Sequence, residues 1–110
     1  MIIPAPNDRL AGLVLILGDE DTRELVRLYL GSVPRLLADL GGGDRASSQR
    51  AAHSLKSSSD QMGATGLWQQ AKALEARIMG GGALPTAEEL AALDAEFRQV
   101  DEALRGYGGS

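Results

Sequence analysis

Apolar residues recur along most of the chain at spacings of three and four, the pattern of amphipathic α-helices. Groups of glycines near residues 42, 81 and 108 interrupt the pattern, and glycine commonly ends helices. The pattern predicts a short helix that ends at Gly18, then longer helices over about 22–40, 44–62 and 64–79. A last helix should begin at Thr86, because Thr86 and Glu89 have the spacing of a capping box.

Four long amphipathic helices with short links predict an all-α fold, an antiparallel four-helix bundle with a short additional N-terminal helix across one end. Composition agrees, because 17 Leu and 16 Ala outnumber the 11 Val, Ile and Thr residues that favour strands. We expect an irregular N-terminal tail at 1–6, the helical bundle domain at 7–106 and a flexible C-terminal tail at 107–110. The helix at 22–40 is expected to bury Leu25, Leu28, Tyr29, Val33, Leu36, Leu37 and Leu40.

Length and charge exclude several classes of protein. A chain of 110 residues has room for one core, and a net charge of −4 opposes binding to nucleic acid or to an anionic membrane. With no cysteine and one histidine, we expect no metal site. The longest apolar run, residues 10–17, is about half a membrane span, and the N-terminus has no basic signal-peptide stretch. These features predict a soluble, cytoplasmic protein.

The single histidine lies on the polar side of the helix at 44–62. At about 100° per residue, the opposite side of that helix carries Ser48, Ala51, Ala52, Leu55, Ser58, Ser59 and Met62. The side of His53 carries Ala46, Gln49, Arg50, Lys56, Ser57, Asp60 and Gln61. A lone surface histidine is most often a spectator. An exposed imidazole nevertheless offers a nitrogen lone pair, and small or cationic neighbours would let it accept a phosphoryl group.

The residues around the histidine form a family signature. His53-Ser54-Leu55-Lys56-Ser57-Ser58-Ser59, followed by Met62-Gly63-Ala64, resembles the H-x-L-K-[GS]-[SA]-S-x-x-[hydrophobic]-G-A motif of histidine-containing phosphotransfer (HPt) domains. These domains belong to bacterial two-component phosphorelays. The resemblance extends over roughly residues 8–105, and includes Leu67, Ala71, Leu74 and Glu75, which resemble the family's fourth helix.

The resemblance implies a phosphocarrier that is not itself an enzyme. His53 would be the phosphoacceptor, Lys56 the nearby cation and Ser57 the small residue beside the imidazole, where the family most often has glycine. A receiver domain or a hybrid sensor histidine kinase would be the partner of a monomer. It would dock on the outer face of the helix at 44–62 and part of the helix before it, contacting Gln49, Arg50 and Asp60. This chain would need no cofactor, whereas the receiver would supply Mg²⁺.

Three other interpretations stay open. A phosphorylation-independent adaptor could keep the bundle and bind a receiver or kinase without accepting phosphate. An oligomerisation bundle would suit the apolar stripe of the last helix. A hydrolase with His53 as general base is disfavoured, because no Asp or Glu lies one turn away to orient the ring and Asp60 is two turns off.

Overall fold

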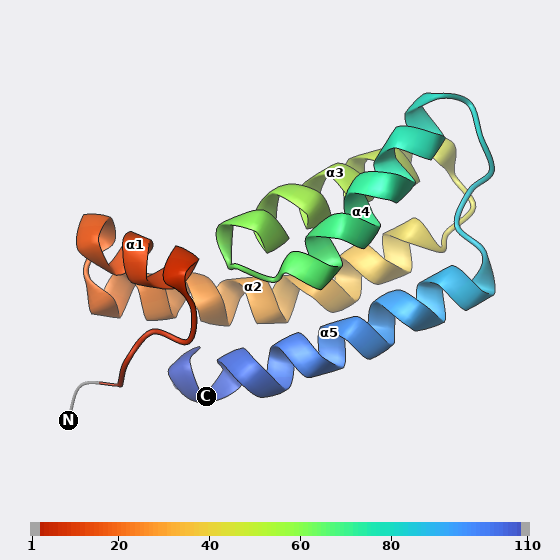
Figure 1. Ribbon diagram of the computed structural model, residues 1–110. Coiled ribbons are helices and arrows are strands. Elements are labelled where there is room, and N and C mark those ends of the chain that lie inside the picture. Colours follow the sequence, from red (N-terminus) through yellow and green to blue (C-terminus); the bar gives the residue numbers. More distant parts are fainter. Residues whose placement is uncertain (1–2, 109–110) are drawn as a thin grey trace.

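The structure is a computed structural model that describes residues 3–108, and its regular secondary structure within that range is α-helix (Figure 1). The helices are α1 (Asp8–Leu17), α2 (Asp19–Leu40), α3 (Arg45–Gln61), α4 (Thr65–Met79) and α5 (Ala87–Gly108). The predicted all-α fold is therefore confirmed. None of these helices in the described range is long and apolar enough to span a bilayer.

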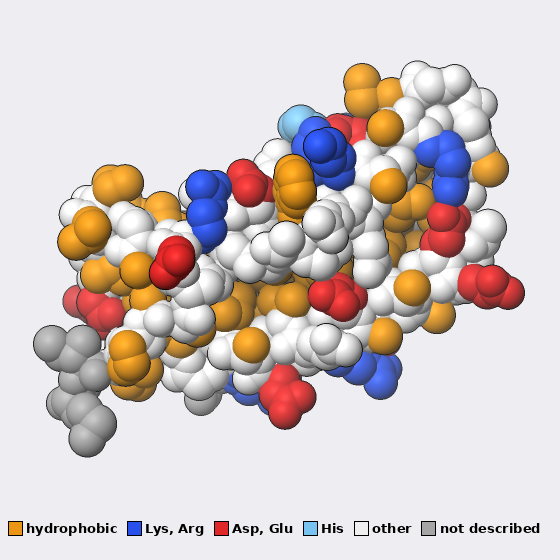
Figure 2. Space-filling model, viewed as in Figure 1, with side chains coloured by type: hydrophobic (Ala, Val, Ile, Leu, Met, Phe, Trp, Pro, Cys, Tyr) orange, Lys and Arg blue, Asp and Glu red, His pale blue; other side chains and the backbone are white. Residues whose placement is uncertain are grey.

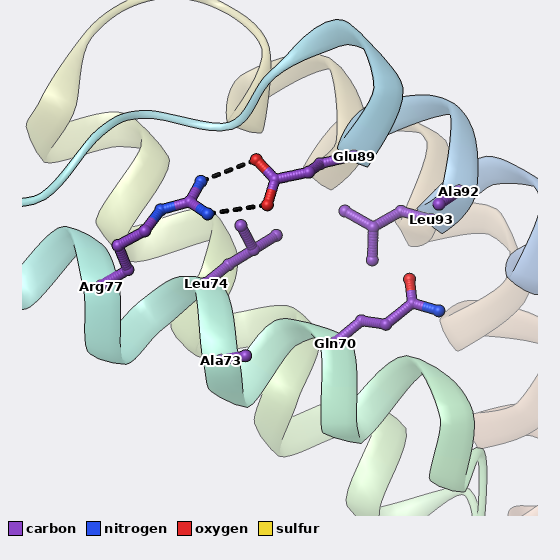
Figure 3. A pocket seen from close by; sticks show the side chains of 7 residues that line it. All are labelled: Gln70, Ala73, Leu74, Arg77, Glu89, Ala92 and Leu93. Atoms are coloured by element: carbon purple, nitrogen blue, oxygen red, sulfur yellow. Dashed lines mark hydrogen bonds and ion pairs between the residues drawn. The ribbon is translucent and has the colours of Figure 1, made fainter.

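Helices α2 to α5 form an elongated bundle, and the chain together with α1 has principal extents of 48 × 22 × 18 Å. Helices α3 and α4 pack most closely, α2 packs against α3 and α5, and α1 lies at one end beside the start of α2 (Figure 1). Helix α5 approaches α4 only loosely. Between these two helices is a mainly apolar hollow of about 210 Å³ (Figure 3).

The core consists mostly of aliphatic side chains from every helix. Leu10, Val26, Val33, Leu55 and Leu67 are fully buried, and Leu93 and Leu104 of α5 are almost so. A deeply buried hydrogen bond joins the hydroxyls of Tyr29 and Ser59 at 2.8 Å. Burial raises the pKa of Tyr29 to about 12, although the hydrogen bond to Ser59 acts in the opposite direction.

The prediction that Leu28 is buried was wrong, because its side chain is 60% exposed. Val26, Tyr29, Val33 and Leu40 form the buried stripe of α2. Leu28 lies about 100° around the helix from Tyr29 and points away from the core. Val26, absent from the expected set, occupies the core with no exposed surface.

Helix α1 is attached to the end of α3 through Asn7. The Asn7 side chain accepts a hydrogen bond from the backbone N–H of Leu10, which caps α1, and donates to the carbonyl of Met62. Gly63 adopts a φ of +75°, and a Cβ there would lie 2.5 Å from Oδ1 of Asn7. Glycine is thus required both by the turn and by the close approach of Asn7. Arg9 adds an ion pair to Asp60, so α1 packs over the end of α3.

The expected flexible tail at 107–110 does not begin at Tyr107, since α5 continues through Gly108 and both residues are buried. The Tyr107 hydroxyl donates to Asp19, and the guanidiniums of Arg23 and Arg27 donate to the carbonyls of Tyr107 and Gly108. These cations satisfy carbonyls that the end of α5 would otherwise leave unpaired. Residues 109–110 of that tail, like residues 1–2 of the N-terminal one, lie outside the described residues.

The capping box predicted at the start of α5 is confirmed. The Thr86 hydroxyl accepts from the backbone N–H of Glu89, and the Glu89 carboxylate accepts from that of Thr86. The same carboxylate accepts two hydrogen bonds of 2.7 Å from the Arg77 guanidinium of α4 (Figure 3). Arg77 and the Thr86 backbone together lower the pKa of Glu89 to about 2.

Candidate functional site

Helix α3 holds the single histidine on the outer surface of the bundle. The Asp44 carboxylate caps this helix by accepting from the backbone N–H of Ser47. Ser48, Ala51, Ala52, Leu55 and Ser59 face the core, as predicted, whereas Ser58 is only partly buried. On the other side, 63% of the His53 side chain is exposed, and Figure 2 shows the histidine protruding at the upper edge of the molecule.

The His53 ring is held by a carboxylate from the neighbouring helix. Its Nδ1 lies 2.6 Å from Oε2 of Glu75, which projects from α4 and is itself 6% exposed. Because an ionised carboxylate only accepts, Nδ1 must carry the proton of this hydrogen bond. When the ring is neutral, the lone pair is therefore on Nε2. In the described part of the chain, no side chain hydrogen-bonds to Nε2.

Lys56 completes a three-membered ionic cluster with the other two side chains. Its ammonium donates to Oε1 of Glu75, and 29% of its side chain is exposed. The hydrogen bond from Lys56 is the largest influence on the pKa of Glu75 and lowers it, and the bond from His53 acts in the same direction. Burial raises that pKa but does not prevail, so Glu75 is ionised at neutral pH.

A shallow hollow opens beside the imidazole, with a volume of about 550 Å³. Seven residues of α3 and α4 line this α3–α4 hollow: Ala46, Gln49, Arg50, His53, Ser54, Glu75 and Met79. The small side chains of Ala46 and Ser54 leave the space open next to His53. A reacting group could thus approach the ring from solvent.

The structure brings only some of the predicted site residues together. Gln49 and Arg50 line the α3–α4 hollow, and Lys56 shares a carboxylate with His53. Ser57 is exposed one turn beyond the ring but does not line the hollow. Asp60 lies a further turn away and pairs with Arg9 of α1, so it faces the other end of α3.

Sequence reasoning missed the carboxylate that orients the histidine. The hydrolase interpretation was disfavoured because no acid lies one turn from His53 on its own helix, and that argument was wrong, since Glu75 reaches the ring from α4. A histidine and carboxylate pair would still need a nucleophile. In the described residues, no serine hydroxyl hydrogen-bonds to His53. Pairing of α3 with α4 was the signal that could have identified Glu75.

The fold and the site together define a helical bundle that presents an oriented, accessible imidazole. The family model described as "Hpt domain" matches residues 24–103, which is most of the chain, so the chain belongs to the Hpt domain family. Family membership implies histidine phosphotransfer in two-component signalling, by a phosphocarrier that is not an enzyme. Helix α1 lies outside the matched range. Searches among curated proteins and among solved structures found no match.

Proposed function

We propose that this chain is a phosphorelay intermediate that carries a phosphoryl group on Nε2 of His53. The observation that carries the proposal is the exposed imidazole held at Nδ1 by the ionised Glu75 in an Hpt-family fold. Nε2 then points its lone pair at solvent, where a phosphorylated aspartate of a receiver domain can reach it. The receiver would supply the acidic pocket and its Mg²⁺.

In the transfer step, the lone pair on Nε2 forms a bond to phosphorus while the bond from phosphorus to the aspartate oxygen breaks. The aspartate leaves as a carboxylate, and the electron pair of the broken bond stays on its oxygen. The ring keeps its Nδ1 proton and gains positive charge, which the neighbouring Glu75 carboxylate offsets. Transfer to a second receiver reverses these changes. Positioning and electrostatics supply the catalysis.

Lys56 and Ser57 have supporting roles in this proposal. Lys56 holds Glu75 in place and provides a cation one turn from the ring, on the side where phosphate adds negative charge. Ser57 is exposed and small, which keeps the approach to His53 clear over the next turn of α3. Gln49, Arg50 and Asp60 are the neighbours proposed to contact the partner, and the monomeric chain needs no cofactor of its own.

The test is to incubate the protein with phosphorylated receiver domains and Mg²⁺ and to detect bound phosphate before and after acid treatment. An acid-labile, alkali-stable label that is absent from His53→Gln is expected. Circular dichroism should show that the variant keeps its helices, because the His53 side chain is exposed. A folded protein that takes no label from receivers or kinases would favour the phosphorylation-independent adaptor. An unfolded His53→Gln variant would show that the histidine is structural.

A further inference from the structure

The α3–α4 hollow extends beyond the reacting imidazole to a side chain that the proposed chemistry does not use. Met79 is the last residue of α4 and lies one turn beyond Glu75 on the same face. Its side chain is 62% exposed and lines the hollow together with His53. Exposure alone would not single out Met79, because isolated exposed apolar residues are normal and Leu15 and Ile16 are more exposed. Met79 differs from these two residues because it lines the same hollow as the reactive imidazole.

A receiver that phosphorylates His53 must cover this hollow. Its aspartate has to come within bonding distance of Nε2, and a stable protein interface buries about 800 Å² on each partner, or 20 to 30 residues a side. One turn of helix is about 5 Å. A partner centred on His53 therefore reaches both rims of the hollow, which are formed by Arg50 on α3 and Met79 on α4.

The two rims differ in chemistry. Arg50 is exposed, and in the described residues its guanidinium hydrogen-bonds only to the Ser47 hydroxyl at 3.2 Å. It can pair with the acidic pocket of a receiver. The carboxylate of Glu75 is already bonded to His53 and Lys56, so it offers little repulsion to an acidic partner. Met79 carries no charge, and its flexible thioether can adapt to an apolar partner surface.

We infer that Met79 is a specificity-determining contact for the receiver domain, which docks over α3 and the end of α4 with an apolar side chain against Met79 and acidic groups against Arg50. This inference rests on the proposed function. It adds the end of α4 to the docking surface that was expected from the sequence on α3 and on part of the preceding helix. The partner is a receiver whose acidic pocket is bordered by an apolar residue.

The experiment separates docking from chemistry with two phosphoryl donors. Phosphoramidate is a small donor that reaches His53 without docking, whereas a phosphorylated receiver domain that labels the wild-type protein must dock. Met79→Ala is expected to slow transfer from the receiver about five-fold, the loss of roughly half a buried methionine, and to leave labelling by phosphoramidate unchanged. Met79→Leu should restore most of the rate, since it nearly conserves volume.

Leu15→Ala is the matched control, because Leu15 is 90% exposed, lies on α1 and does not line the hollow. It should transfer at the wild-type rate. Salt gives an independent signature. The loss of transfer rate caused by Arg50→Ala should become smaller as ionic strength rises, because salt screens its charge. The loss caused by Met79→Ala should stay constant.

Two results would overturn the inference: Met79→Ala accepting phosphate from the receiver as fast as wild type, or Leu15→Ala losing as much rate as Met79→Ala. Failure of the proposed function looks different. In that case neither phosphoramidate nor the receiver would give a label that depends on His53. The wild-type protein and His53→Gln alone would show this result.

Discussion

Replacing Glu75 with glutamine tests whether a buried carboxylate sets the reactive nitrogen of His53. In the wild-type protein, Glu75 accepts the Nδ1 proton at 2.6 Å and so leaves the lone pair on Nε2. In the Glu75→Gln variant, the side-chain amide oxygen can accept the same proton but carries no charge. The variant therefore keeps the size of the side chain and weakens the preference for one tautomer, and it also removes the charge that pairs with Lys56.

The size of the effect follows from the type of hydrogen bond. A bond to a charged group contributes about 1.5–3 kcal/mol and a neutral one about 0.5–1.5 kcal/mol. The difference, about 1–1.5 kcal/mol, corresponds to a roughly ten-fold change in the ratio of the two tautomers. Transfer should slow by a similar factor, because the same carboxylate also offsets the charge that develops on the ring. Glu75→Ala should cost more, since it removes the acceptor.

The assay combines NMR of the ring nitrogens with labelling kinetics. Nitrogen-15 shifts distinguish a protonated from an unprotonated ring nitrogen, so they report directly which nitrogen of His53 holds the proton. Labelling by phosphoramidate reports the reactivity of Nε2 without a partner. A purely structural role for Glu75 would alter thermal unfolding but would not move the tautomer ratio.

Asp60→Asn provides the matched control for loss of a carboxylate on the same side of α3. Asp60 is 56% exposed and pairs with Arg9, away from the ring. Its amide variant should keep both the tautomer of His53 and the rate of labelling by phosphoramidate, a reaction that involves no docking partner. The reasoning is refuted if wild-type His53 carries its proton mainly on Nε2, or if Glu75→Gln and Asp60→Asn label equally fast.

Three further outcomes are expected. Lys56→Ala should slow transfer while the helices remain folded, and should raise the pKa of Glu75, which carbon-13 NMR of its carboxyl would measure; an unchanged rate would remove Lys56 from the mechanism. Ser59→Ala leaves the buried hydroxyl of Tyr29 unpaired and should cost about 1–3 kcal/mol in urea unfolding, much of it recovered by adding Tyr29→Phe; a double variant as unstable as the sum of the single ones would contradict this. The pKa of Glu89 is about 2, below its ordinary 4.5, so its stabilisation is present above pH 4.5 and is lost as pH falls towards 2. Glu89→Gln should lower the free energy of unfolding by about 1 kcal/mol at pH 7, a modest loss for a partly exposed pair, and by little at pH 2.5. Equal losses at the two pH values would refute the stabilising role of the Glu89 carboxylate.

The helices could be predicted from the sequence because their signals are local. Capping residues, glycine breaks and three-four spacing act within one or two turns, and the Thr86 capping box formed as expected. Burial was harder to predict within α2, where Leu25, Val26, Leu28, Tyr29 and Leu30 are nearly consecutive. Two overlapping apolar stripes fit that run equally well, and only packing against α3 and α5 selects the one that contains Val26.

The end of α5 shows how distant contacts override a local signal. Glycines around Tyr107 favour a break, since glycine weakens a helix interior. Arg23 and Arg27, more than eighty residues earlier, donate to the last carbonyls and hold the helix to Gly108. These arginines look like solvated surface charges when α2 is considered alone. Their role follows only from the antiparallel placement of α2 beside α5.

Glu75 is an intermediate case, because its place beside His53 follows from the predicted helix topology and not from the residues next to His53 in the sequence. Helices α3 and α4 form a hairpin that turns near Ala64, and His53 and Glu75 lie eleven residues on either side of it. In an antiparallel hairpin, residues equally distant from the turn lie at the same height, because both helices rise about 1.5 Å per residue. Once an antiparallel bundle is predicted, the position of Glu75 beside His53 can therefore be predicted as well. Residues one turn from His53 on its own helix include no such carboxylate. The side chain that leaves the lone pair on Nε2 is Glu75, which lies across the hairpin on α4.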